Sequence, residues 1–261
     1  MDAFQFDYKA YYHENKLNEL LKTNYVQTKL YKPGFVFDID GKDPFAPDCD
    51  DLVRLHHIIR SRKVMTVLEF GVGWSTAVMA DALYKNHVDY ADKIKNTLRR
   101  VDPFTLYTVD TEKKYIDITE NNLPDHLRPH VEFLTTSAYL TTFNGRICGR
   151  LEKLPNICPD FVYSDGPSFR SIKGDVNGIS MDHQDRTIIT SDLLMMEPLF
   201  LPGTLILFDG QTNNARFHKN NFQRNWKYKH LKKEDISVFE LIEEPLGPYN
   251  ELQLKFQNIL D

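Results

Sequence analysis

The chain has 261 residues and a mass of 30.5 kDa, enough for one large domain or for one domain with a small appendage. Its hydrophobic content is 41%, its charges are interspersed, and no apolar run approaches the roughly 20 residues that span a bilayer, so we expect no membrane partner. The formal net charge of −5 gives no general electrostatic reason to expect nucleic acid. The N-terminus lacks the basic start and apolar core of a signal peptide, and no Cys-x-x-Cys pair occurs. We therefore expect a cytoplasmic protein with reduced thiols.

Residues 1–50 are expected to form an N-terminal extension or cap, and residues 51–261 the main domain. Within the extension we expect a short helix over residues 14–22, a turn over 31–34, and an irregular segment over 38–47 that is rich in Asp and Pro. A longer helix is predicted after Asp48, because Asp is a good N-cap and Asp50 and Asp51 suit the first turn of a helix.

From residue 64 onward, short apolar segments alternate with helical ones. The predicted strands are residues 64–70, 105–109, 131–134, 161–164 and 204–208, and the predicted helices are residues 74–84, 112–122 and 191–199. A polar insertion over residues 85–102 delays the second strand. This alternation predicts an α/β fold with an open parallel sheet and helices on both faces. Residues 237–242 and 252–256, joined by Pro-Leu-Gly-Pro, indicate a closing antiparallel hairpin.

The first strand leads into a glycine turn that bears on function. Glu69 lies near the end of the strand, Gly71 and Gly73 follow it, and a helix is expected to begin just afterwards. Glycines in such a turn let a backbone approach a nucleotide-like ligand closely. A dinucleotide-binding turn has a third Gly or Ala at the sixth position, where this chain has Thr76.

The E-x-G-x-G pattern resembles motif I of the class I S-adenosylmethionine (SAM)-dependent methyltransferases. The resemblance covers about residues 64–257 in element order. It implies a three-layer, Rossmann-like fold with a seven-stranded, mostly parallel sheet that ends in an antiparallel hairpin. It also implies SAM as the cofactor, bound at Gly71 and Gly73.

Further cofactor contacts follow from the same resemblance. It implies that Glu69 faces the ammonium group of the methionine end, Asp110 the ribose hydroxyls and Ser137 the adenine. Each has a simpler alternative: Glu69 could bond turn amides, and Asp110 could cap the helix that begins near residue 112.

Asp165 and Asp209 follow the fourth and fifth strands, where adjacent parallel strands would place both carboxylates beside the methyl donor. Two such carboxylates, with Asn213 or Asn214 as a third ligand, suit Mg²⁺. The pair is similar to that of the metal-dependent O-methyltransferases that act on catechols and sugars, although those enzymes usually have Asn or Asp where Gly210 stands here. Without a metal, Asp165 would meet the amino group of the cofactor or the acceptor.

Three more side chains are candidates for contacts with the acceptor. His183, in the polar connection over residues 168–185, is the best-suited general base, because its ordinary pKa lies near neutral pH. Arg216, and Arg170 in the same connection as His183, are candidates to bind an anionic group of the acceptor. The simpler reading makes His183 a surface residue and Arg216 part of a solvated basic helix face that runs to Lys233.

Together these features predict a SAM-dependent methyltransferase that acts on a hydroxyl of a small polar acceptor, such as a sugar or a phosphorylated metabolite, with catalysis by Asp165, Asp209 and His183. A nitrogen acceptor remains open. The alternatives are an NAD-dependent oxidoreductase and a non-catalytic binding protein with a methyltransferase fold. A homodimer is compatible with the aromatic N-terminal segment.

Overall fold

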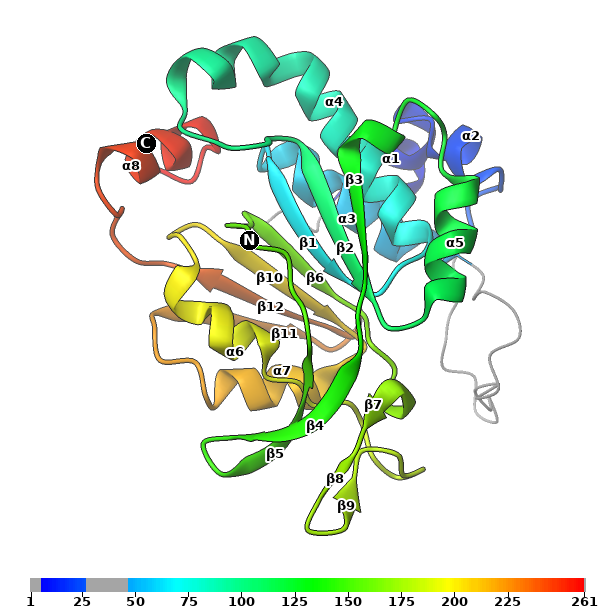
Figure 1. Cartoon of the computed structure of the whole chain (residues 1–261). Helices are drawn as coiled ribbons and strands as arrows, with labels where there is room; N and C mark the ends of the chain where they lie inside the picture. The colour runs from blue at the N-terminus through cyan, green and yellow to red at the C-terminus, as the bar shows by residue number, and fades with distance from the viewer. Residues whose placement is uncertain (1–5, 27–46, 261) are drawn as a thin grey trace.

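The computed structural model of the protein describes residues 6–26 and 47–260 (Figure 1). Its centre is a seven-stranded sheet with the order β11-β12-β10-β6-β1-β2-β3. The strands of this sheet are β1 (Thr66–Phe70), β2 (Thr105–Asp110), β3 (Val131–Thr135), β6 (Phe161–Ser164), β10 (Leu205–Asp209), β11 (Trp226–Leu231) and β12 (Ile236–Leu241). The first five are parallel to one another, and β12 and β11 close the sheet, with β12 antiparallel to both β10 and β11.

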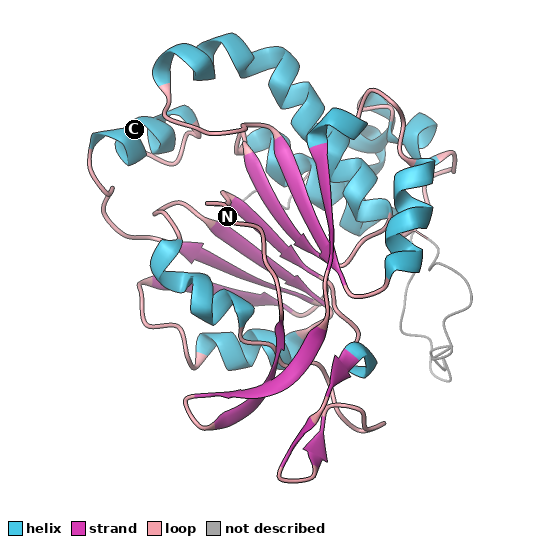
Figure 2. Ribbon diagram, in the orientation of Figure 1, coloured by secondary structure: helices cyan, strands magenta, loops and turns pink. Residues whose placement is uncertain are grey.

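Helices cover both faces of this sheet (Figure 2). They are α1 (Tyr8–Glu14), α2 (Leu17–Leu21), α3 (Cys49–Ser61), α4 (Trp74–Thr97), α5 (Lys113–Asn122), α6 (Asp192–Met196), α7 (Thr212–Lys219) and α8 (Pro248–Phe256). Along β10, Leu205 and Leu207 pack into a core with α3 and α4, whereas Ile206 and Phe208 pack into a second core with α6 and α7. Burial on both sides explains why these strands are apolar without alternation.

The described part of the N-terminal segment packs against the helices of the main domain. Tyr12, Leu17 and Leu21 share a buried cluster with Leu52, Val53 and Val78 of α3 and α4. In addition, the Tyr11 hydroxyl bonds Nδ1 of His56 on α3 at 2.7 Å. Of the helix expected over residues 14–22, α2 forms only from Leu17 to Leu21; the preceding α1 ends at Glu14, and Lys16 between the two helices has a positive φ of 57°. The expected turn at 31–34 and most of the irregular segment lie outside the described residues.

The closing hairpin is present and its segment expected over residues 237–242 is β12, but the partner strand differs from the one expected. Residues 226–231 and 236–241 form it, whereas residues 252–256 belong to α8. Gly247, with φ of 80°, precedes this helix and Pro248 is its first residue, a placement that proline favours. The basic run read as a helix face is partly β11, in which exposed Lys227 and Lys229 alternate with half-buried Trp226 and Tyr228.

Two connections also differ from expectation. The helix expected over residues 74–84 continues as α4 to Thr97, through most of the predicted polar insertion. Between β3 and β6 the chain forms an antiparallel hairpin, β4 (Ala138–Phe143) with β5 (Arg146–Leu151), against which β7 (Ile172–Lys173) pairs. A small hairpin, β8 (Asp175–Val176) with β9 (Ile179–Ser180), follows. Short 3₁₀ turns are η1 (Arg128–His130), η2 (Phe169–Ser171) and η3 (Glu197–Leu199).

Across residues 6–26 and 47–260, none of the helices combines the length and the apolarity that crossing a membrane requires.

Candidate active site

The five parallel strands end along one edge of the sheet, and the predicted polar residues follow those ends. The register pairs Phe70 of β1 with Ser164 of β6 and with Val109 of β2, and it pairs Phe208 of β10 with Ser164. The residues after these positions, among them Asp110, Asp165 and Asp209, therefore lie along the same edge. In open α/β sheets this is the edge that binds ligands.

The glycine turn is held by close backbone packing. Gly71 has φ of 101°, which L side chains rarely adopt, and its N–H donates to the carbonyl of Val109 at 2.9 Å. Gly166, after β6, packs so tightly on this turn that a Cβ there would lie 2.9 Å from Cα of Gly71. A Cβ at Gly73 would meet no atom of residues 6–26 and 47–260 within 4 Å. The turn is thus fixed from below at Gly71 and open to a ligand at Gly73.

Glu69 is fully buried beneath the turn. Its carboxylate accepts hydrogen bonds from the hydroxyls of Ser75 at 2.5 Å and Thr76 at 2.7 Å, and Thr76 accepts the N–H of Gly73 at 3.0 Å. Desolvation raises the pKa of Glu69 to about 7, against the effect of its hydroxyl partners. Glu69 therefore supports the turn and the start of α4. Its direct contact with a ligand ammonium group stays a prediction.

Asp110 lies at the tip of β2, half-buried beside the glycine turn. It accepts the N–H of Glu112 at 2.8 Å, and the N–H groups of Thr111 and of Val72 in the glycine turn also lower its pKa, although burial raises the pKa overall. Glu112 is itself the N-cap residue of α5, so Asp110 is not the helix cap. Ser137 is exposed. It lies close to Asp110, because the N–H of the preceding Thr136 donates to the Asp110 carbonyl at 3.0 Å.

Asp165 and Asp209 come from strand positions that face the α3 side of the sheet, as Tyr163 does. Oδ2 of Asp209 accepts a hydrogen bond from the Tyr163 hydroxyl at 2.7 Å. The pKa of Asp209 is raised well above its ordinary value, first by desolvation and then by Asp51 and Asp165. Asp165 keeps contact with solvent. Desolvation by the surrounding protein raises its pKa, and the charges of Glu69 and Asp51 raise it further.

Sequence reasoning missed the contribution of α3 to this site. Asp51 forms an ion pair with Arg54 one turn later, and the Arg54 side chain, only 4% exposed, also bonds Tyr8 of α1. The charge of Asp51 raises the pKa values of Asp165 and Asp209, and Arg54 lowers that of Asp209. The spacing of an acid and an arginine three residues apart was visible in the sequence. The sequence analysis explained Asp51 by its place in the first turn of the helix alone.

The three acceptor candidates lie on separate elements. His183 is exposed in the connection after β9, where its Nδ1 accepts the N–H of Asp185 at 3.2 Å. Arg216 is exposed on α7, and Arg170 is half-buried in η2. In the described parts of the chain, no hydrogen bond or ion pair joins His183 or Arg216 to Asp165 or Asp209. Their predicted roles remain untested.

A metal at Asp165 and Asp209 would have few protein ligands. No group of three or more His, Cys, Asp or Glu side chains within residues 6–26 and 47–260 is arranged to hold one. The Asn214 amide is occupied by Thr190 and Gln211, and Asn213 donates to Thr187 at 2.9 Å. Two carboxylates are nevertheless enough for Mg²⁺, which usually keeps several water ligands. Desolvation is the main cause of both raised pKa values, and repulsion by neighbouring carboxylates, which a cation would relieve, adds to it. A Mg²⁺ ion at this pair stays a prediction.

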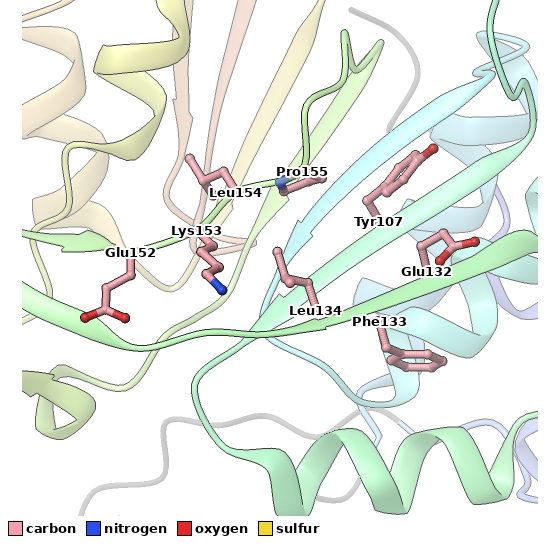
Figure 3. Close-up of a pocket in the computed structure, with 8 residues that line it drawn as sticks. All are labelled: Tyr107, Glu132, Phe133, Leu134, Glu152, Lys153, Leu154 and Pro155. Atoms are coloured by element: carbon pink, nitrogen blue, oxygen red, sulfur yellow. The ribbon is translucent and has the colours of Figure 1, made fainter.

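A cavity of about 570 Å³ lies beside β2 and β3 (Figure 3). It lies between the face of β2 and β3 and the segment that follows β5. Its lining residues are Tyr107, Glu132, Phe133, Leu134, Glu152, Lys153, Leu154 and Pro155. The lining segment is tied to the end of β3, because the N–H groups of Glu152 and Lys153 donate to Ser137 and Thr136 at 2.9 and 3.0 Å.

With five parallel strands and a closing antiparallel pair in this order, the sheet matches the one predicted. This strand order, with an antiparallel pair at one edge, is the order that the resemblance to the class I methyltransferases implies.

Solved structures that are similar to this chain include two O-methyltransferases and one cofactor-bound protein. An O-methyltransferase from Bacillus cereus, in complex with S-adenosylhomocysteine (SAH), shares 14% identity over 90% of each chain, with a TM-score of 0.43. The O-methyltransferase TomG from Streptomyces achromogenes, in complex with SAM, shares 14% over 76% of this chain and 82% of its own, with a TM-score of 0.41. Cofactor-bound Rv0187 from MTB shares 12% over 77% and 84%, with a TM-score of 0.45.

No family model and no curated protein matches the chain. Likeness of the level found among solved structures concerns the arrangement of the chain and assigns neither an activity nor a substrate.

Proposed function

We propose that the protein is a SAM-dependent methyltransferase that methylates a hydroxyl of a small polar molecule, such as a sugar or a phosphorylated metabolite. The observation that carries this proposal is the open position at Gly73 beside Asp110. A turn packed tightly below and empty above leaves room for a ligand backbone, and a fixed carboxylate on the next strand suits two ribose hydroxyls.

The cofactor-binding residues in this proposal are Gly71, Gly73, Asp110 and Ser137, with Glu69 beneath the turn. Gly71 and Glu69 shape the turn, since one has a positive φ and the other bonds both hydroxyls of the first turn of α4. Asp165 would lie nearest the amino group of the cofactor or the acceptor. The shared edge of the sheet supports these assignments, which rest on chemistry at each position.

SAM, when bound, supplies an electrophilic methyl group on a sulfonium. The work of this chain is then to orient the acceptor oxygen in line with that methyl group and to receive its proton. Asp165 and Asp209 are the carboxylates placed for this task, and Mg²⁺ held between them would lower the pKa of the acceptor hydroxyl. His183 would take the proton instead only if its connection moved over the site.

The acceptor is proposed to be held in part by cationic side chains of the surrounding elements. Arg170 and Arg216 would pair with a phosphate or carboxylate group of the acceptor. We further propose that the protein acts in the cytoplasm and that a homodimer is compatible with its aromatic N-terminal helices.

The decisive experiment is calorimetric titration of the protein with SAH, with and without Mg²⁺. Micromolar binding in the wild type and its loss, by at least tenfold, in Asp110→Ala is expected. Asp117→Ala, which removes a surface acid from α5, is the matched control and should bind as the wild type does.

Other outcomes would favour the alternatives. Absence of SAH binding by the folded protein, with binding of NADH, would favour an oxidoreductase. Thr76 argues against that, because its hydroxyl is committed to Glu69 and Gly73 at the position where dinucleotide turns have a small residue. Tight SAH binding without methyl transfer to any hydroxyl or amine would favour a binding protein.

A further inference from the structure

The three-stranded sheet of β5, β4 and β7 extends beyond the ends of the parallel strands (Figure 1). Its middle strand, β4, follows β3 after only Thr136 and Ser137, and β7 follows Asp165 after the short turn η2. The sheet therefore connects two parts of the ligand edge. On one of its faces, Ala138 and Ile172 pack into the core that contains α6 and α7.

The opposite face of this sheet carries two cationic side chains beside an aromatic one. The register pairs Tyr139 of β4 with Arg150 of β5 and with Lys173 of β7. Residues directly opposite one another on neighbouring strands project to the same face, with Cβ atoms about 5 Å apart. The phenol of Tyr139, which is 36% exposed, therefore has a cationic neighbour on each adjacent strand.

The guanidinium of Arg150 has no hydrogen-bond partner in the described parts of the chain. Its Nε is buried and unbonded, and within residues 6–26 and 47–260 no hydrogen bond or ion pair involves its other nitrogens. Burial raises the pKa of nearby Asp192 to about 6, although the charge of Arg150 lowers it, and Oδ1 of Asp192 accepts the N–H of Leu151 at 3.0 Å. A buried donor without a partner costs free energy, so folding alone does not explain Arg150.

This group of side chains lies near the proposed cofactor site. Tyr139 is two residues from Ser137, about 7 Å along an extended strand, and Ser137 lies close to Asp110 at the ligand edge. On β7, Nζ of Lys173 donates to the carbonyl of Arg170 at 3.2 Å, which holds the ammonium group near η2. A ligand that spans the two sides of the edge would therefore meet both cations.

We propose that Arg150 and Lys173, opposite Tyr139 on its two neighbouring strands, bind the phosphate group of the acceptor. This inference rests on the proposed function, and it names the acceptor as a phosphate monoester rather than a neutral sugar. A phosphate monoester has three acceptor oxygens and nearly two negative charges at neutral pH. A guanidinium offers a rigid fork of donors and an ammonium group a compact charge, so the pair suits a dianion better than a carboxylate.

The test uses inorganic phosphate as the probe, because its binding requires neither SAM nor knowledge of the acceptor. Titration followed by ³¹P NMR at constant ionic strength and without Mg²⁺ should show saturable binding to the wild type. Arg150→Gln should weaken this binding at least tenfold and Lys173→Gln at least threefold. Arg146→Gln is the matched control, because it removes the same charge from the same strand at an arginine that bonds Asn221 at 2.9 Å. It should change the phosphate affinity less than twofold.

Thermal unfolding separates a binding role of Arg150 from a structural one. Without phosphate, the midpoint of Arg150→Gln should stay within about 2 °C of the wild type, because the guanidinium has no partner to lose. Phosphate should raise the midpoint of the wild type and leave that of the variant unchanged. A lower midpoint of Arg150→Gln without phosphate would make Arg150 a structural residue and overturn the proposal.

The remaining outcomes are equally decisive. Equal phosphate affinity in Arg150→Gln and the wild type overturns the proposal, and displacement of phosphate by an equal concentration of acetate overturns the assignment to phosphate. SAH affinity of Arg150→Gln should stay within twofold of the wild type. Absence of SAH binding in the wild type, with phosphate affinity dependent on Arg150, would instead reject the proposed function and leave the anion site standing.

Discussion

At the scale of single residues, the site is shaped by carboxyl groups that are held away from water or close to one another. Glu69 is the clearest case, because it is fully buried and, among the described residues, hydroxyl-bearing side chains rather than cations act to lower its pKa. The Thr108 side chain also acts to lower the pKa of Glu69, and its hydroxyl donates to the Gly71 carbonyl at 2.8 Å. Desolvation outweighs all of these partners, so the pKa of Glu69 is raised.

This arrangement makes the stability of the protein depend on pH through Glu69. Because the folded-state pKa of about 7 lies above the ordinary value of 4.5, the contribution of Glu69 is full below pH 4.5 and is lost as the pH rises to about 7. The difference in unfolding free energy between the wild type and Glu69→Gln should fall by about 3 kcal/mol across this window. Urea unfolding at several pH values measures it, and parallel pH profiles for the two proteins would contradict the buried, protonated state.

At the scale of elements, the ligand edge is built by loops that pack on one another. The turn after β1 and the turn after β6 touch through backbone atoms at Gly71 and Gly166, with no side chain between them. The adjacent Gly73 differs, since its φ of 167° is extended backbone that any residue adopts and open space surrounds its missing side chain. Gly166 therefore serves the packing of the glycine turn, whereas Gly73 leaves room beside the turn for a ligand.

Alanine substitutions at these positions should behave in opposite ways. Gly166→Ala pushes a Cβ against the Gly71 backbone, so we expect a loss of stability of about 1–3 kcal/mol together with weaker SAH binding. Gly73→Ala should cost less than about 1 kcal/mol, because it only changes a helix N-cap, yet it should weaken SAH binding tenfold or more. Thermal unfolding and calorimetry test both. Full SAH affinity in Gly73→Ala would mean that no ligand approaches this turn.

At the scale of the whole molecule, the N-terminal segment is joined to the domain that carries the site. The proposed division into an extension of residues 1–50 and a domain of residues 51–261 follows the motifs, yet α1 and α2 bury Tyr12 and Leu17 against α3 and α4. The same helix α3 delivers Asp51 and Arg54 to the site. Disturbance of the N-terminal helices should therefore reach the acids at the strand ends.

Truncation of a buried N-terminal side chain measures this connection. Leu17→Ala should destabilise the protein by about 2–5 kcal/mol while a single cooperative unfolding transition is retained. Leu246→Ala, at a leucine that is 59% exposed, is the control and should have little effect. A separate early transition in Leu17→Ala, monitored by urea unfolding with two spectroscopic probes, would show that the extension folds as its own unit.

Much of the fold and part of the site could be predicted from local patterns. The five parallel strands were predicted within one or two residues, because strands buried on both faces are continuous apolar runs that local composition reveals. The N-cap at Asp48 and the turn at Gly71 were likewise predicted from short-range rules, and the structure confirms both. Since parallel strands end at one edge, their order along the chain also predicted that Asp110, Asp165 and Asp209 would share it.

The remaining features depend on contacts between residues far apart in the chain. Whether residues 226–231 or 252–256 pair with β12 was decided by the burial of Trp226 and Tyr228 against the sheet, because both segments contain apolar residues at strand-like intervals. The contact of Gly166 with Gly71, the link of Tyr163 to Asp209 and the charge of Asp51 beside both aspartates each join separate elements. The sequence alone determined which residues follow each strand. Only the tertiary structure decided which of them meet, because side-chain distance, burial and charge coupling arise when helices pack on the sheet.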